Sequence, residues 1–352
     1  MLSRATINHW LCEHDPRRLE ELWAEADRTR SAWVGDAVHL RGLIEVSNHC
    51  VRACHYCGIR AENAGVTRYR LTHEQVMTAA RAALAFGCGT VVLQAGEDRG
   101  LSAGAVAAMI RGIKALGDIA VTLSLGERSD VEFAQWRAAG ADRYLLRIET
   151  SNETLYRAVH PPRGRQPSER KAMLARLRAL GYAIGSGVLV GLPGQTWSDL
   201  ADDIVFLEER ALDMIGVGPF IAHPATPLGA QPAEAGGTEQ VPADELTTCK
   251  VMALARLACP WANIPSTTAL SALDPERGRE SGLKRGANVV MPNFTPLPYR
   301  AFYEIYPGKA ACGDEPDRVA ERLKDRITRL GRPIAAGRGD AVRPVESAPV
   351  CA

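Results

Sequence analysis

Short apolar segments alternate with amphipathic segments along most of the chain, and this alternation constrains the fold more than any other feature. Each apolar run is followed by a stretch with helical periodicity, which is the pattern of strand–helix units on a parallel sheet. Eight such units favour an α/β fold that closes as a (β/α)8 barrel of the TIM type. The expected strands cover residues 43–46, 90–93, 120–123, 143–146, 183–188, 214–217, 262–265 and 287–290.

Helical segments between these runs carry start and stop signals. Residues 72–86 begin at Thr72, a suitable N-cap, and stop at Gly87, while residues 168–180 stop at Gly181. Residues 16–33 predict a helix ahead of the first strand. We therefore expect an N-terminal helical cap at 1–35, the barrel at 36–310, and a C-terminal helix and tail at 311–352, with the Gly- and Pro-rich tail after residue 331 ordered weakly or only by docking.

Charge and hydropathy exclude several classes of partner. The chain has 42 basic and 41 acidic residues, a formal charge of +1 and no long basic block. We therefore expect neither nucleic acid nor a membrane as partner, and we expect the substrate to be small. No apolar run reaches the roughly 20 residues that cross a bilayer, and residues 1–10 lack the order of a secretory signal. These features predict a cytoplasmic protein.

Three of the nine cysteines are packed into eight residues, which suits metal ligation in a reducing compartment. Cys50, Cys54 and Cys57 follow the first expected strand, at the barrel face where active sites form. Three thiolates can hold a 4Fe–4S cubane whose fourth iron is free to chelate S-adenosylmethionine (SAM). One electron into the sulfonium would release a 5′-deoxyadenosyl radical. The alternatives are a zinc site completed by His49 or His55 and core cysteines grouped by chance.

The cysteine loop, with Tyr56 before the third cysteine, resembles that of the radical SAM superfamily. Further motifs resemble its FeFe-hydrogenase maturase family, HydE, from about Val34 to Lys309. The resemblance implies a radical enzyme that assembles the diiron subcluster of the hydrogenase H-cluster. It also implies one 4Fe–4S cluster, SAM, an organometallic substrate (a cysteine complex of iron, carbonyl and cyanide), partner maturation proteins, and a flavodoxin or ferredoxin as electron donor. The motifs lie at 68–72, 92–98, 121–127, 140–147, 190–196, 218–221, 264–268, 291–293 and 306–309.

Candidate SAM contacts stand at the ends of expected strands. Glu149 suits the ribose or the amino group, and Arg170 suits the carboxylate through a two-pronged hydrogen bond. Ser124 ends the third strand. The resemblance assigns these three residues to the cofactor and lays Tyr56 along the adenine. Each alone has an ordinary alternative: a solvated surface charge for the glutamate or arginine, a helix cap for the serine.

The turn after the second strand offers backbone contacts. Gly96 and Glu97, followed by Asp98, would bring carbonyl groups to the methionine amino group, because glycine permits a close approach. The alternative is an ordinary strand-to-helix turn.

Side chains pointing into the barrel are candidates for substrate contact, although packing residues would show the same pattern. A buried Arg147 needs a counter-charge, either an anionic substrate or the nearby Glu149. The candidates are Thr122, Arg147, Thr267, Thr268, Met291, Tyr303 and Tyr306.

The chain departs from the HydE pattern at Ala95, where the family commonly has serine, and at Ile148, where it commonly has histidine. The sequence near Cys312 has no further cysteines that could hold a second cluster with it, so a single cluster is expected. Two other functions stay open: a radical SAM amino-acid mutase or sulfur-inserting enzyme of the methylornithine synthase or biotin synthase type, and a non-catalytic metal-binding scaffold barrel.

Overall fold

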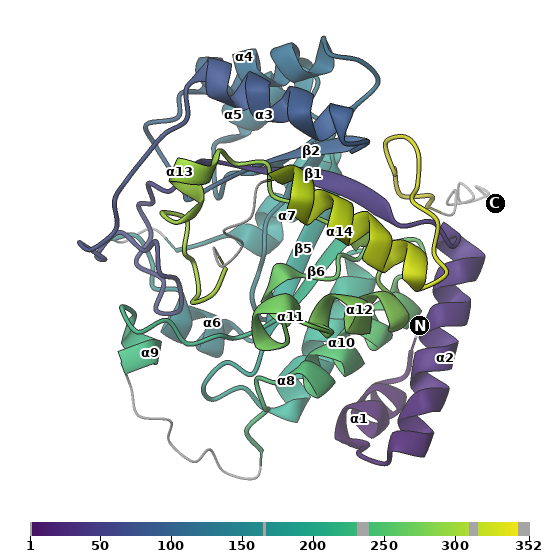
Figure 1. Ribbon diagram of the computed structural model, residues 1–352. Coiled ribbons are helices and arrows are strands. Elements are labelled where there is room, and N and C mark those ends of the chain that lie inside the picture. The colour runs from purple at the N-terminus through teal and green to yellow at the C-terminus, as the bar shows by residue number, and fades with distance from the viewer. Residues whose placement is uncertain (1, 165–166, 231–238, 310–315, 344–352) are drawn as a thin grey trace, which may run out of the picture.

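A curled parallel sheet forms the centre of the computed structural model, with helices around its outside (Figure 1). The structure describes residues 2–164, 167–230, 239–309 and 316–343. Seven strands hydrogen-bond in the order β6-β5-β4-β3-β2-β1-β7, so consecutive strands are neighbours from β1 to β6. The strands are β1 (His39–Ser47), β2 (Thr90–Ala95), β3 (Ala120–Ser124), β4 (Arg143–Leu145), β5 (Ala183–Val190), β6 (Met214–Pro219) and β7 (Val289–Val290).

The α/β class and seven of the eight expected strands are confirmed, but the segment 262–265 is not a regular strand. It makes single parallel bridges on both sides, Met214 to Asn263 and Pro265 to Val289, and β7 pairs with β1. Pro265 has no N–H to donate, which shortens the ladder. The side-chain Oδ1 of Asn288 accepts instead from the N–H of Ile264 at 2.9 Å. Seven strands and one bridging segment thus line the barrel.

The helices form the outer layer. At the start of α3 the expected cap is present: the Thr72 hydroxyl accepts from the N–H of Gln75, and the Gln75 side chain accepts from the N–H of Thr72. Helix α7 begins at Arg170, two residues after the expected start. The helices are α1 (Arg4–Cys12), α2 (Pro16–Val34), α3 (His73–Ala85), α4 (Ala103–Lys114), α5 (Asp130–Ala138), α6 (Glu153–Val159), α7 (Arg170–Ala179), α8 (Trp197–Glu209), α9 (Pro227–Ala230), α10 (Glu245–Ala258), α11 (Thr268–Leu273), α12 (Gly278–Lys284), α13 (Leu297–Arg300) and α14 (Pro316–Arg329).

The two ends of the chain pack against different parts of the barrel. Helices α1 and α2 lie against α8 and α10. Residues 332–343 cross the amino end of the strands, where the N–H of Val38 donates to Pro333 and Arg343 pairs with Asp213. Residues 332–343 therefore dock at the amino end of the barrel. The division into three regions stays a prediction.

No helix among the described residues is both long and apolar enough to cross a membrane.

Candidate active site

The loop that follows β1 carries Cys50, Cys54 and Cys57, at the carboxyl end of the barrel as expected. Arg68 holds this loop from outside. Its guanidinium donates to the carbonyl groups of Asn48 at 2.6 Å, Ile59 at 2.7 Å and Arg60 at 2.6 Å. One side chain thus joins the residues before and after the cysteines.

The three thiols are close enough to affect one another's ionisation. Burial raises the pKa of Cys50, raises that of Cys54 to about 12, and raises that of Cys57, and neighbouring cysteine thiols raise the last two further. A bound metal would displace these protons because the thiolate is the ligand. Backbone N–H groups of Arg52 and Glu97 lie 3.4 Å from the Cys50 sulfur. Such hydrogen bonds are among the features that tune iron–sulfur clusters, so the donors fit a cluster held by thiolates.

Among the described residues no three His, Cys, Asp or Glu side chains converge closely enough to hold a single metal ion. The zinc alternative requires such convergence around one centre. The choice between a cluster and zinc on these cysteines stays a prediction.

Gly96 is buried directly beneath the cysteine loop. A Cβ atom at this position would overlap the carbonyl oxygen of His49 and lie 2.9 Å from the Cβ of Cys50. The missing side chain at Gly96 thus lets the cysteine loop pack closely against this turn. The carbonyl groups of Gly96 and Glu97 accept from Asp98 and Val51, and each oxygen retains a second lone pair. Their contact with SAM stays a prediction.

Glu149 has a backbone φ of +62°, which is uncommon for a residue with a side chain. It is buried, and its carboxylate accepts from Tyr56 Oη at 3.3 Å and from Arg147 Nε at 3.0 Å. Of the two alternatives for Arg147, the structure has the pairing with Glu149. Strained residues of this kind cluster at functional sites, and the φ value is a signal that the sequence could not supply.

Arg170 begins helix α7 and reaches back toward the cysteines. Its Nε donates to Glu127 at 3.1 Å, its Nη1 to the carbonyl of Arg147 at 2.7 Å, and its Nη2 to His160 at 2.9 Å. His160 therefore accepts at Nε2 and carries its proton on Nδ1. Burial, together with the charges of Arg170 and Arg52, lowers the pKa of His160 to about 2. A neutral histidine and a glutamate thus hold this guanidinium in place.

Arg52 is a central residue of the site that the sequence reasoning missed. Its guanidinium lies 2.8 Å from Glu97 and 2.7 Å from Glu127, and all three side chains are less than a tenth exposed. Glu127 also accepts from Ser168 and Arg170. A continuous buried network therefore connects the cysteine loop to α7. The available signal was the position of Glu97 and Glu127 just past β2 and β3.

The expected substrate residues differ in their surroundings. The hydroxyls of Thr122 and Thr267 are buried and have no hydrogen-bond partner within the described ranges. Thr268 and Tyr306 share a hydrogen bond of 2.6 Å. Tyr303 is buried, while Ser124 and Met291 are half-buried. The two unpartnered hydroxyls are the features here that most favour a ligand, because a buried polar group without a partner is costly.

A buried ion pair adds a further feature that the sequence did not reveal. Lys309 pairs with Glu45 of β1, and both side chains are almost fully buried. The Lys309 ammonium lies 4.7 Å from the centre of the Tyr303 ring, and Asn293 donates to Glu45 at 3.1 Å. Lys309 thus connects the segment after α13 to the first strand, and it orients Tyr303, one of the expected substrate residues.

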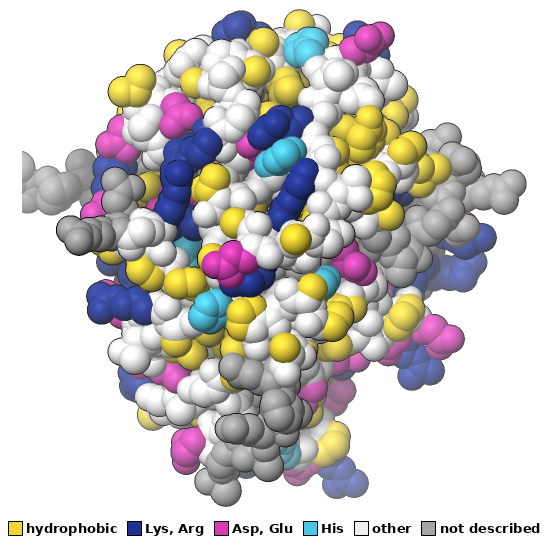
Figure 2. Space-filling model, turned by 90° about the vertical axis from the view of Figure 1, so that its left-hand side faces the viewer, with side chains coloured by type: hydrophobic (Ala, Val, Ile, Leu, Met, Phe, Trp, Pro, Cys, Tyr) yellow, Lys and Arg dark blue, Asp and Glu magenta, His cyan; other side chains and the backbone are white. Residues whose placement is uncertain are grey.

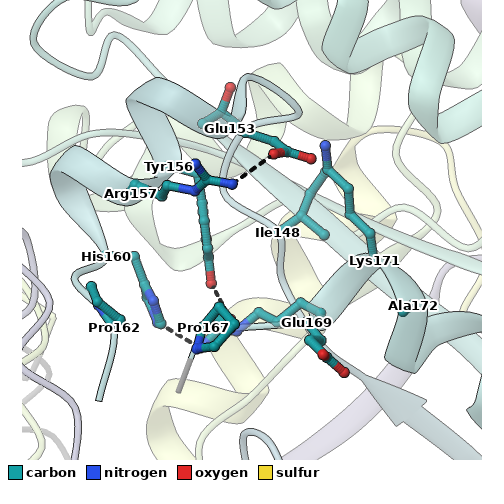
Figure 3. A pocket seen from close by; sticks show the side chains of 13 residues that line it. Ile148, Glu153, Tyr156, Arg157, His160, Pro162, Pro167, Glu169, Lys171 and Ala172 are labelled. Carbon is teal, nitrogen blue, oxygen red and sulfur yellow. Dashed lines mark hydrogen bonds and ion pairs between the residues drawn. The ribbon is translucent and has the colours of Figure 1, made fainter. Parts of the chain in front are cut away.

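A cavity of about 680 Å³ lies between the end of β4 and helices α6 and α7 (Figure 3). The stacked rings of Tyr156 and His160 form one wall, with centroids 4.8 Å apart. Ile148 lines this cavity, whereas Arg147 and Glu149 contact each other instead. The departure from the HydE pattern at Ile148 therefore lies in the lining of this cavity, outside the Arg147–Glu149 pair. Cys312 lies outside the described residues.

Comparison with known proteins shows the family to which this chain is related. Residues 44–207 match the family profile of the radical SAM superfamily. The [FeFe] hydrogenase maturase subunit HydE of Thermotoga maritima is 43% identical over 330 residues, which cover 94% of this chain and 91% of that protein. The 3-methylornithine synthase of Methanosarcina acetivorans is 26% identical over 294 residues, 82% of this chain and 79% of that protein.

Two solved structures share the fold. Methylornithine synthase superposes with a TM-score of 0.79 at 22% identity, covering 95% of this chain and 94% of its own. The FeFe-hydrogenase maturase HydG from Carboxydothermus hydrogenoformans superposes with a TM-score of 0.69 at 19% identity, covering 83% of this chain and 67% of its own. At these identities the likeness concerns architecture alone.

Proposed function

The chain belongs to the HydE family of the radical SAM superfamily, and from this premise we propose that it makes a 5′-deoxyadenosyl radical for assembly of the hydrogenase diiron subcluster. The 43% identity to a HydE over 94% of the chain carries the proposal. The family implies a 4Fe–4S cluster and SAM. The three-cysteine loop at the carboxyl end of the barrel supports both, because it leaves one iron open to the cofactor.

Cys50, Cys54 and Cys57 would hold one cluster. When bound, it supplies one electron that cleaves SAM into methionine and a 5′-deoxyadenosyl radical. The chain prepares the loop for it: Arg68 clips the backbone on both sides of the cysteines, and two backbone N–H groups point at the Cys50 sulfur. A loop fixed beforehand does not have to be ordered when the cluster binds.

Arg170 and Glu149 would anchor SAM at opposite ends. Among the residues that the structure describes, Glu127, Arg147 and His160 use three of the five N–H groups of the Arg170 guanidinium, which leaves two for the methionine carboxylate. The Glu149 oxygens keep lone pairs for the ribose hydroxyls. Gly96 and Glu97 carbonyls would take the amino group, Ser124 would complete the set, and Tyr56, hydrogen-bonded to Glu149, would lie along the adenine.

The substrate would lie deeper in the barrel. The unpartnered hydroxyls of Thr122 and Thr267 support this placement, since a polar ligand would satisfy them. Glu149 already compensates the Arg147 charge, so that arginine can bind a neutral or weakly anionic substrate without leaving an isolated charge. The cysteine complex of iron, carbonyl and cyanide, with the radical acting at sulfur, is the proposed substrate. Its other contacts would be Arg147, Thr268, Met291, Tyr303 and Tyr306.

The proposal extends to cellular context. A thiolate-held cluster requires a reducing compartment, so we place the protein in the cytoplasm. Other hydrogenase maturation proteins would supply the substrate and take the product, and a flavodoxin or ferredoxin would supply the electron.

Maturation of a hydrogenase tests this function. A FeFe-hydrogenase is produced with its other maturation proteins, with and without this chain, and hydrogen evolution is measured. We expect activity only with the intact chain, and none with Cys54→Ala. Arg28→Ala, a change in an exposed pair on α2, should mature the enzyme normally. Maturation that does not need the chain, or that survives the loss of Cys54, would overturn the proposal.

A further inference from the structure

The outer surface of the cysteine loop contains a hollow of about 350 Å³ with an unusual lining. Cys50 is the one cluster cysteine that lines it, next to His49, Arg68, Arg70 and Arg99. We infer that this hollow is where the electron donor docks, and that the donor is a small protein with an acidic surface around its redox centre. The inference rests on the proposed function, because it assumes a cluster on Cys50.

The charges are layered so that a partner meets the positive groups first. The carboxylates of Asp98 and Glu97 are 2% exposed, whereas the side chains of Arg70 and Arg99 beside them are each 41% exposed. Arg70 Nε lies 2.7 Å from Asp98, and Arg99 lies 3.8 Å from Glu97, which is already paired with Arg52. Buried acids thus hold the arginines in position while the surface keeps a positive potential.

Arg68 adds charge to the same rim. It donates to backbone carbonyls only, and it has no carboxylate partner in the part of the chain that is described. Arg60 is paired with the exposed Glu62 farther along the loop and contributes little net charge. Figure 2 faces the side of the molecule where this loop lies and shows Lys and Arg side chains gathered beside histidines.

The patch differs from an ordinary solvated surface because it lies directly beside a cluster cysteine. The sulfur of Cys50 accepts from backbone N–H groups of Arg52 and Glu97, and its residue forms part of the hollow's wall. Cys54 is buried, and neither it nor Cys57 is in the lining. A partner seated here would therefore be separated from the cluster by little more than one cysteine. The donor loses one electron and the cluster gains it.

The chemistry of the patch favours a transient partner. Exposed complementary charges raise the association rate more than the affinity, and their effect falls with ionic strength. Electron-transfer encounters sit at the small end of interface sizes. An acidic flavodoxin meets these requirements, because it must bind, deliver one electron and leave.

Arg99→Glu is the sharpest test, because this side chain is exposed and has no direct role in holding the loop. Binding of a flavodoxin is measured at low and high salt by calorimetry, with both cluster-loaded and cluster-free protein. We expect the Kd at low salt to rise about three- to tenfold, with the difference vanishing at high salt. Arg99→Gln should give a smaller rise. Arg28→Glu on α2, whose side chain is 68% exposed, is the matched control and should leave the Kd unchanged.

Reduction kinetics separate this inference from the proposed function. Cluster bleaching is followed with photoreduced flavodoxin and, in parallel, with dithionite. Slower reduction of the Arg99→Glu variant by flavodoxin, with dithionite unaffected, supports docking at this hollow. Equal rates and equal Kd for wild type and Arg99→Glu, or equal losses in Arg28→Glu, would overturn it. A wild-type protein that fails to cleave SAM with dithionite contradicts the proposed function, while the cluster-free binding still decides the docking site.

Discussion

Replacing Arg52 with methionine should destabilise the protein strongly. Its guanidinium pairs with Glu97 and Glu127, whose side chains are 2% and 9% exposed. Glu127 keeps Arg170 and Ser168, but Glu97 is left with Arg99 at 3.8 Å. Removing one partner of a buried pair costs about 3–5 kcal/mol because the other charge stays buried. We expect a loss of this size in the free energy of unfolding.

Urea unfolding of the cluster-free protein, followed by circular dichroism at neutral pH, measures this loss. The double variant Arg52→Met with Glu97→Gln should recover most of it, since the buried negative charge is then absent. Arg28→Met is the control, because it breaks a pair whose members are 68% and 54% exposed and should cost about 0–1 kcal/mol. A loss in Arg52→Met no larger than in Arg28→Met would refute the reasoning.

Two further predictions concern the loop and the pH dependence. Gly96→Ala should lower the iron bound after reconstitution, because its Cβ would overlap the loop carrying Cys50, whereas Gly104→Ala, with nothing within 4 Å, should bind iron normally. The pKa of His160 is about 2 in the folded protein, against the ordinary histidine value of 6.5, so the unfolded chain takes up the proton first. Its contribution to stability should therefore fall by about 1.4 kcal/mol per pH unit below 6.5, and His160→Gln should remove that slope in urea titrations.

The strands were predictable because a parallel sheet covered by helices buries both faces, which leaves continuous apolar runs in the sequence. The exception is instructive. In the segment 262–265, the N–H of Ile264 donates to the Asn288 side chain instead of a neighbouring strand, and Pro265 has no N–H to donate. The side-chain amide that replaces this one ladder hydrogen bond comes from a residue distant in the sequence, so local periodicity does not reveal it.

The same distinction applies to the site. The three cysteines lie within one loop, so their spacing was visible in the sequence and predicted a metal site, either a cluster or zinc. The Arg52 network joins residues from four separate segments, and which carboxylate meets which arginine is decided by tertiary packing. Likewise, the sequence left two possible counter-charges for Arg147, an anionic substrate or Glu149, and the fold pairs it with Glu149. The packing of Gly96 against the cysteine loop is likewise set by the fold, and its expected approach to a ligand stays a prediction.

Product formation is the most direct test of the central claim. The protein is reconstituted anaerobically with iron and sulfide, reduced with dithionite and supplied with SAM, and 5′-deoxyadenosine and methionine are quantified. The account predicts a 4Fe–4S absorption spectrum and equimolar formation of the two products, both lost in Cys54→Ala and retained in Arg28→Ala. Absence of the cluster spectrum, or cleavage of SAM that persists without Cys54, would contradict it.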